Sequence, residues 1–184
     1  MSVRTTPEIA RVALFAALIG LGALVTIPFV GPVPFTLQPL VVLLTGMVLG
    51  PRLAPLSVLV YLTLGLVAPV YSGGQAGVGV LIGPTGGYLM GFVLAAWVAG
   101  VVAHRGPPSF ARYAVAGLAG LIPVYALGAT WLAMHLELTS VWGVLVAGVL
   151  QFLPLDVMKA LLAAGLAGAL VSSPLGLPAL RRDQ

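Results

Sequence analysis

Six stretches of apolar residues follow one another along the chain, separated by short segments rich in proline, glycine and charge. Apolar stretches of about 20 residues are typical of helices that cross a lipid bilayer. The pattern predicts spans at residues 9–28, 36–49, 53–69, 84–103, 113–134 and 154–171. The connections are too short to hold a soluble module, so we expect one domain over residues 1–184. The predicted fold is an all-α integral membrane protein, a bundle of six transmembrane helices.

The second predicted span is short for a bilayer, so it must be tilted, buried in the bundle or flanked by thinned lipid. Alternatively, residues 36–69 form one helix that is broken around Gly50 and Pro51. Six spans with a cytoplasmic amino terminus place every arginine in a cytoplasmic segment, whereas five spans would move four arginines outside, against the positive-inside bias. The arginines are Arg4, Arg11, Arg52, Arg105, Arg112, Arg181 and Arg182. We therefore predict six spans with amino and carboxyl ends both cytoplasmic.

This topology leaves three segments on the outer side of the membrane: residues 29–35, 70–83 and 135–153. The last segment is too long for a simple turn. Its apolar part, Val141 to Phe152, has a length typical of an interfacial or re-entrant helix rather than of a span.

Composition removes several classes of function. The chain is 60% hydrophobic and only 7% charged, so its solvent is membrane lipid. The net charge of +4 comes from single basic residues between apolar runs, which does not predict a nucleic-acid surface. No cysteine is present, and His104 and His135 fall at opposite membrane edges, so no metal site is predicted. Neither a nucleophile elbow nor a pair of acids indicates an enzyme.

Asp156 and Lys159 are the charged residues that fall within an apolar segment. They are three residues apart, which puts them on one helical face. Charges inside a membrane are costly and rare, so they mark a functional site by default. Two interpretations stay open. The pair is either a structural ion pair that locks the last helix into the bundle, or a polar clamp for a ligand.

Two outer segments have the composition of pocket walls. Residues 71–79 and 83–88 are dense in glycine, which permits close backbone approach to a ligand and suits a lid, although a flexible connector has the same composition. The Walker pattern is absent, so this is not a phosphate loop. Residues 32–39 contain three stiffening prolines before and after an uncharged glutamine, which fits a pocket wall or simply a helix boundary.

The first span carries small residues at helical spacing. Ala13 and Ala17 form one small-xxx-small pair, and Ala16 and Gly20 form another on a neighbouring face. Small residues let helices approach closely in lipid. This spacing indicates either a docking face for a partner protein or internal packing.

Three motifs together resemble those of the BioY family, the biotin-specific substrate-binding subunits of energy-coupling factor (ECF) transporters. They are Pro-Val-Pro-Phe-Thr-Leu-Gln at 32–38, Gly-Pro-Thr-Gly-Gly-Tyr at 83–88 and Phe-Leu-Pro-x-Asp-x-x-Lys at 152–159. The resemblance covers nearly the whole chain. The family more often has glycine before its aspartate, where this chain has Leu155, a difference that affects local packing and keeps both charges.

The resemblance implies a multi-pass protein of the cell membrane that captures biotin from outside. It also implies association with a transmembrane coupling subunit and two cytoplasmic ATPase subunits, with Ala13 and Ala17 as the docking face. No cofactor is implied, because biotin is the transported ligand. The alternatives are a substrate-binding subunit for another vitamin and a stand-alone biotin carrier.

The chemistry of biotin agrees with these residues. Lys159 is suited to pair with the carboxylate of biotin, and Asp156 either accepts from the ureido N–H groups or holds Lys159 in place. Which end of biotin faces which charge stays open. The other candidate polar partners are uncharged: Gln38, Gln75, Thr85 and Tyr88.

Overall fold

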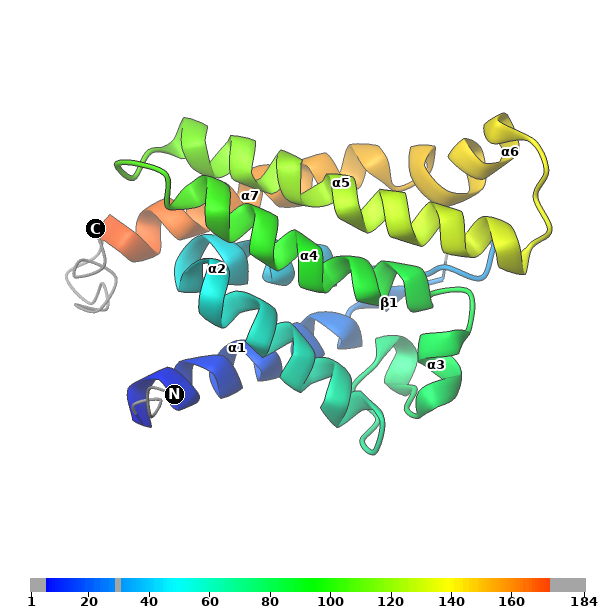
Figure 1. The fold of residues 1–184 in the computed structure, drawn as a ribbon, viewed down its shortest axis with the longest axis horizontal. Coiled ribbons are helices and arrows are strands. Elements are labelled where there is room, and N and C mark those ends of the chain that lie inside the picture. The colour runs from blue at the N-terminus through cyan, green and yellow to red at the C-terminus, as the bar shows by residue number, and fades with distance from the viewer. Residues whose placement is uncertain (1–5, 29–30, 173–184) are drawn as a thin grey trace.

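The computed structural model describes residues 6–28 and 31–172 and is mostly helical (Figure 1). Within these residues, five helices are long and apolar enough to cross a membrane, which makes the chain a multi-pass membrane protein. They are α1 (Thr6–Leu24), α2 (Gln38–Gly65), α4 (Gly86–Ala103), α5 (Phe110–His135) and α7 (Leu153–Ser172). The short elements are β1 (Thr26–Ile27), β2 (Phe35–Thr36), η1 (Ser72–Gly74), α3 (Val78–Ile82), α6 (Val141–Leu145) and η2 (Val146–Leu150).

Helix α2 covers most of the second and of the third predicted span. At Gly50 the backbone has φ +76° and ψ 178°, a conformation that favours glycine, and Pro51 follows. The side chain of Gln38 donates to the hydroxyl of Tyr61 over 2.7 Å, although the two residues are 23 positions apart. In a straight helix they would be separated by about 35 Å. The chain therefore turns back at Gly50, and α2 consists of two antiparallel arms.

Two predicted span ends lie four residues beyond the ends of the helices, 28 against 24 and 69 against 65. The first helix ends at Leu24 rather than at residue 28, because residues 26 and 27 pair antiparallel with residues 36 and 35. The fold is thus not purely α-helical but includes this two-stranded ribbon. The second arm of α2 ends at Gly65 rather than at residue 69. A Cβ atom at Gly65 would overlap the ring of Tyr71, and the Gly65 carbonyl accepts from the N–H of Gly77.

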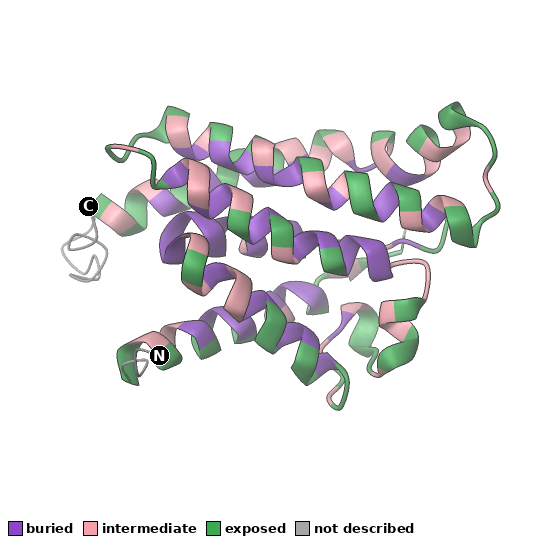
Figure 2. Ribbon diagram, viewed as in Figure 1, coloured by how far each residue is buried: buried purple, intermediate pink, exposed green. Residues whose placement is uncertain are grey.

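Small residues let the long helices pack closely, as small residues do in membrane bundles. Helix α4 lies between α2 and α5, while α1 packs on α2 and α7 packs on α5 and α2 (Figure 1). A Cβ atom at Gly100 in α4 would lie 2.6 Å from the backbone nitrogen of Pro51, and one at Gly91 would lie 2.8 Å from the Cα of Val124. Buried residues line the faces that these helices turn toward one another (Figure 2).

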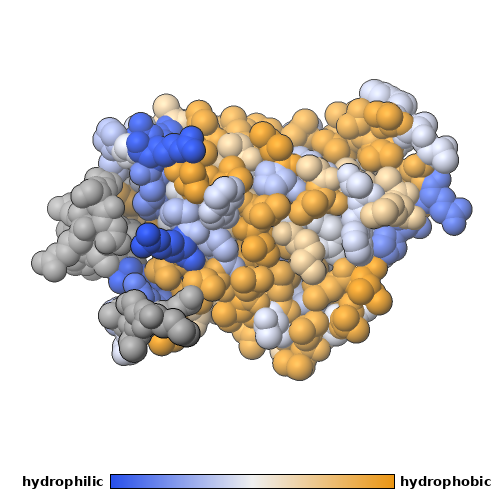
Figure 3. Space-filling view, in the orientation of Figure 1, coloured by the Kyte–Doolittle hydropathy of each residue, from blue (hydrophilic) through white to orange (hydrophobic). Residues whose placement is uncertain are grey.

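The bundle has two distinct ends. At the turn end lie the reversal of α2 at Gly50, the connection from α4 to α5, the start of α1 and the end of α7 (Figure 1). At the ribbon end lie β1, β2, η1, α3, α6 and η2. Polar surface gathers at both ends, with a mostly apolar band between them (Figure 3). The predicted interfacial or re-entrant helix corresponds to α6 and η2, where the carbonyl of Gly148 accepts from the hydroxyl of Tyr88.

We expect the contact between α4 and the α2 reversal to be sensitive to a single methyl group. Gly100→Ala places that methyl against backbone atoms that cannot move aside, so it should destabilise the protein by about 1–3 kcal/mol. Gly165→Ala in α7 is the matched control, because a Cβ atom at that position would meet nothing within 4 Å. Thermal unfolding of both variants in detergent measures the difference. Equal melting temperatures would contradict this packing.

Candidate functional site

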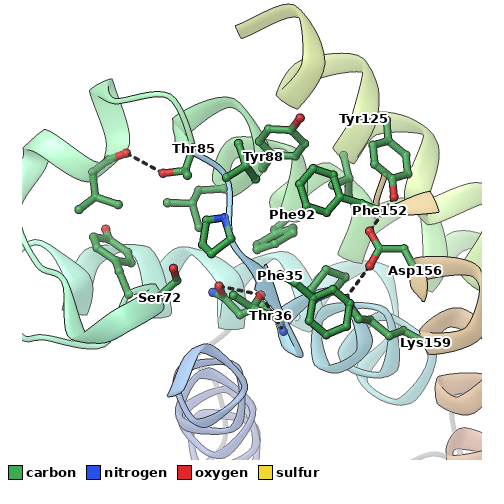
Figure 4. Close-up of a pocket in the computed structure, with 18 of the residues that line it drawn as sticks. Phe35, Thr36, Ser72, Thr85, Tyr88, Phe92, Tyr125, Phe152, Asp156 and Lys159 are labelled. Carbon is green, nitrogen blue, oxygen red and sulfur yellow. Dashed lines mark hydrogen bonds and ion pairs between the residues drawn. The ribbon is translucent and has the colours of Figure 1, made fainter. Parts of the chain in front are cut away.

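A pocket opens at the ribbon end and is lined by β2, the glycine-rich segment, α4, α5 and α7 (Figure 4). The structure brings all six predicted polar residues to its wall: Gln38, Gln75, Thr85, Tyr88, Asp156 and Lys159. A second, more open hollow shares Gln75, Val80 and Thr85 with the pocket and extends to Pro32.

Asp156 and Lys159 form a buried ion pair one turn apart on α7. The Lys159 ammonium donates to Oδ1 of Asp156 over 2.6 Å, and the lysine and the aspartate are only 2% and 5% exposed, respectively. Their i, i+3 spacing places both side chains on the face of α7 that lines the pocket. Two charges this deeply buried are stable only when each is paired and hydrogen-bonded.

Two aromatic residues from other elements complete this charged centre. The hydroxyl of Tyr125, on α5, donates to Oδ2 of Asp156 over 2.6 Å. The Lys159 nitrogen lies 3.6 Å from the ring centroid of Phe35, on β2, which is a cation–π contact. Figure 4 shows Asp156 between Tyr125 and Lys159, with Phe35 beside the lysine. Sequence reasoning missed both aromatics. A tyrosine within a predicted span, whose hydroxyl needs a partner in lipid, was the available signal for Tyr125.

The uncharged polar residues already have partners within the protein. Gln38 donates to Tyr61 and accepts from Thr36 over 3.3 Å, and Tyr88 donates to the carbonyl of Gly148 over 2.7 Å. Thr85 donates to the carbonyl of Val80 over 3.5 Å. Gln75 is exposed at the rim. These bonds fix the side chains, while their remaining donors and lone pairs are available to a ligand.

Aromatic and aliphatic side chains form the rest of the wall, including Leu89, Phe92, Val124 and Phe152. An apolar cavity with a few convergent polar groups is the usual form of a small-molecule site. The arrangement therefore suits a ligand with one anionic group, a few uncharged hydrogen-bonding groups and an apolar body.

The glycine-rich segment is attached to the rest of the bundle at two places, near Gly83 and at Gly73. The indole N–H of Trp131 donates to the carbonyl of Gly83 over 2.9 Å, and Nε2 of His135 lies 2.8 Å from the carbonyl of Ile82. At the second place, the N–H of Gly73 donates to the hydroxyl of Thr26 over 3.1 Å. The segment therefore forms part of the pocket wall and is anchored to α5 and the β1 region.

Ala13 and Ala17 lie on the exposed face of α1, away from the pocket. Leu14 and Leu21 are exposed on the same face. Ala16, of the second small-residue pair, is instead buried. The first pair is thus available to another protein or to lipid, whereas Ala16 serves internal packing.

The described residues contain no group of three histidine, cysteine, aspartate or glutamate side chains that could hold a metal ion. His104 lies beside Gly50 at the turn end, and His135 lies beside Ile82 at the ribbon end.

Comparison with known proteins gives consistent matches in sequence and in fold. A model described as the BioY family matches residues 1–174. The probable biotin transporter BioY of Pyrococcus horikoshii is 41% identical over 154 residues, which cover 83% of this chain and 89% of that protein. The biotin transporter BioY of Thermotoga maritima is 40% identical over 158 residues, which cover 85% of this chain and 91% of that protein. A solved structure of the S-component for biotin from an ECF-type ABC transporter matches with a TM-score of 0.80 at 26% identity, covering 93% of this chain and 96% of that one.

The buried pair predicts a specific order of stabilities in the absence of ligand. Lys159→Met should destabilise the protein by about 3–5 kcal/mol, because it leaves the Asp156 carboxylate buried without its partner. Adding Asp156→Leu to Lys159→Met should recover much of that loss, since both desolvation costs vanish together. Met158→Leu, at an exposed position on the same turn, is the control. Thermal unfolding in detergent that ranks the double variant no higher than Lys159→Met would refute this account.

Proposed function

The chain belongs to the BioY family, a family of transporters and not of enzymes, and we propose that the pocket at its ribbon end is where it binds biotin. Its function is biotin uptake. The transported molecule has a carboxylate, an apolar tail, a thioether ring and a ureido group. The pocket offers a matching set of groups.

The single observation that supports this site best is the buried ammonium of Lys159 in a mostly apolar and aromatic wall. An ammonium has three N–H donors, and the Asp156 carboxylate takes one of them. A ligand carboxylate placed beside Lys159 would receive a charge-assisted hydrogen bond shielded from water. We therefore assign the carboxylate of biotin to Lys159.

The uncharged groups are proposed to bind the rest of the molecule. Gln38, Gln75, Thr85 and Tyr88 offer donors and acceptors for the ureido group, which carries two N–H groups and one carbonyl. The rings of Phe92 and Phe152 suit the apolar tail and the thioether ring.

We propose that the bundle crosses the membrane six times, with both ends of the chain in the cytoplasm. The reversal at Gly50 supports this topology, because each arm of α2 then counts as one crossing. Arg52 and Arg105 are exposed at the turn end, and Arg112 lies near Gly106 at the same end. The positive-inside bias then puts the turn end in the cytoplasm and the pocket outside. Arg4, Arg181 and Arg182, which the sequence argument also used, lie outside the described residues.

Residues 1–184 are proposed to act as one substrate-binding domain in the cell membrane and to dock on an ECF module. That module consists of a transmembrane coupling subunit and two cytoplasmic ATPase subunits. The sequence has no nucleotide-binding motif of its own, which fits a subunit whose ATPase activity is supplied by partners. The exposed face of α1 with Ala13 and Ala17 fits close approach of a partner helix.

Binding of biotin to the purified protein tests the assignment of Lys159. Lys159→Ala should weaken biotin binding by about 1.5–3 kcal/mol, or one to two decades in Kd, the scale of a hydrogen bond to a charged group. Binding of the biotin methyl ester should fall less, because the ester has no carboxylate to lose. Calorimetric titration measures both ligands, with Met158→Ala as control at an exposed neighbour of Lys159. Unchanged biotin affinity in Lys159→Ala would exclude the lysine, and tight binding of another vitamin in preference to biotin would support the alternative substrate.

Docking on a coupling subunit is tested at α1. Ala13→Trp or Ala17→Trp should lower recovery of the complex and slow biotin uptake while biotin binding stays near normal, because a bulky ring separates helices that pack closely. Ala169→Trp, at an exposed alanine of α7, is the matched control. Unchanged pull-down yields in both α1 variants would place docking elsewhere. Uptake into liposomes without ATPase partners would instead support a stand-alone carrier.

A further inference from the structure

Tyr125 connects the buried charged pair to a second helix. Its hydroxyl on α5 lies 2.6 Å from Oδ2 of Asp156, while the Lys159 ammonium lies 2.6 Å from Oδ1. Each oxygen of this carboxylate therefore meets one donor, and the two donors come from different helices. Both contacts are drawn in Figure 4.

The two donors together define the orientation of the carboxylate. With Lys159 alone, Asp156 and the lysine could turn together, because both lie on one face of α7 and the lysine chain is flexible. The bond from Tyr125 adds a fixed point on α5. The ring of Phe35 limits the ammonium from a third direction at 3.6 Å. A lysine side chain alone does not fix the direction of its N–H groups. The contacts with Asp156 and Phe35 therefore affect how well the ammonium can hydrogen-bond to a ligand.

We propose that Tyr125 is a positioning residue that gives the pocket its preference for a carboxylate ligand. It orients Asp156, and Asp156 in turn holds the Lys159 ammonium toward the pocket. This inference rests on the proposed function, in which Lys159 receives the carboxylate of biotin. It also assigns Asp156 the task of holding Lys159, because Oδ1 accepts from the lysine while Oδ2 is fixed by Tyr125.

Two other roles of Tyr125 make different forecasts. As a packing residue, it would affect every ligand alike through the shape of the wall. As a direct ligand contact, it would act independently of Lys159, because its oxygen would accept from the ligand while its proton goes to Asp156. The positioning role alone requires that its effect pass through Lys159.

A double-mutant cycle separates these roles. Wild type, Tyr125→Phe, Lys159→Ala and the combined variant are titrated with biotin and with biotin methyl ester. Tyr125→Phe should weaken biotin binding roughly tenfold, the lower end of the scale for a hydrogen bond to a charged group, and ester binding by a clearly smaller factor. In the Lys159→Ala background, Tyr125→Phe should have almost no further effect on biotin, because linked residues are not additive.

Controls keep the result interpretable. Tyr113→Phe removes the hydroxyl of a second tyrosine of α5, which is buried but does not line the pocket, and it should leave both affinities unchanged. Unfolding of each variant without ligand shows whether it is folded. If Tyr125→Phe does not fold, Asp156→Asn loosens the same connection from the other side and should also weaken biotin more than the ester.

Three outcomes would overturn the inference: equal losses for biotin and ester, additive losses in the cycle, or no loss in Tyr125→Phe while Lys159→Ala weakens biotin. If Lys159→Ala itself leaves biotin binding unchanged, the proposed function fails at Lys159 and the inference fails with it. The two failures are thus distinguished by the Lys159→Ala arm.

Discussion

The burial of one ammonium and one carboxylate in an apolar bundle is the constraint around which the pocket is organised. Charges in such surroundings need partners, and α7 alone supplies only one bond between Asp156 and Lys159. The remaining partners come from elsewhere in the chain, as Tyr125 on α5 and Phe35 on β2. The groups that contact the pair therefore come from three segments that are distant in the sequence, namely α7, α5 and β2. The wall of the pocket lies where these segments meet.

Close helix packing makes this convergence possible. Because α4 meets the α2 reversal at Gly100 and meets α5 at Gly91, these three helices pack closely side by side. At the ribbon end, Trp131 and His135 attach the glycine-rich segment to α5, and Tyr125 of the same helix donates to Asp156, so α5 contacts both the segment and the charged pair. The turn end, with its exposed arginines, has no part in the pocket. The pocket and the exposed arginines thus lie at opposite ends of the bundle.

The sequence predicted those features that depend on composition and local spacing. Apolar runs predicted the membrane class and most helices, and the i, i+3 spacing of Asp156 and Lys159 predicted their shared face. Two features could not be predicted from the sequence. The ribbon depends on pairing between separate segments, and the contacts of Tyr125 and Phe35 with the charged pair arise only from tertiary packing. The sequence indicated a possible break at Gly50, but the charge argument treated one broken helix and two separate spans as mutually exclusive structures. The structure has one helical element that turns back on itself.

A structure of the protein with bound biotin tests the central claim most directly, because it locates both ends of the ligand at once. The account predicts biotin in the pocket between the ribbon and α7, with its carboxylate within about 3.2 Å of the Lys159 nitrogen and its ureido group toward the uncharged polar residues. Asp156 should keep both of its bonds to the protein. Biotin bound outside this pocket, or with its carboxylate turned away from Lys159, would contradict the account.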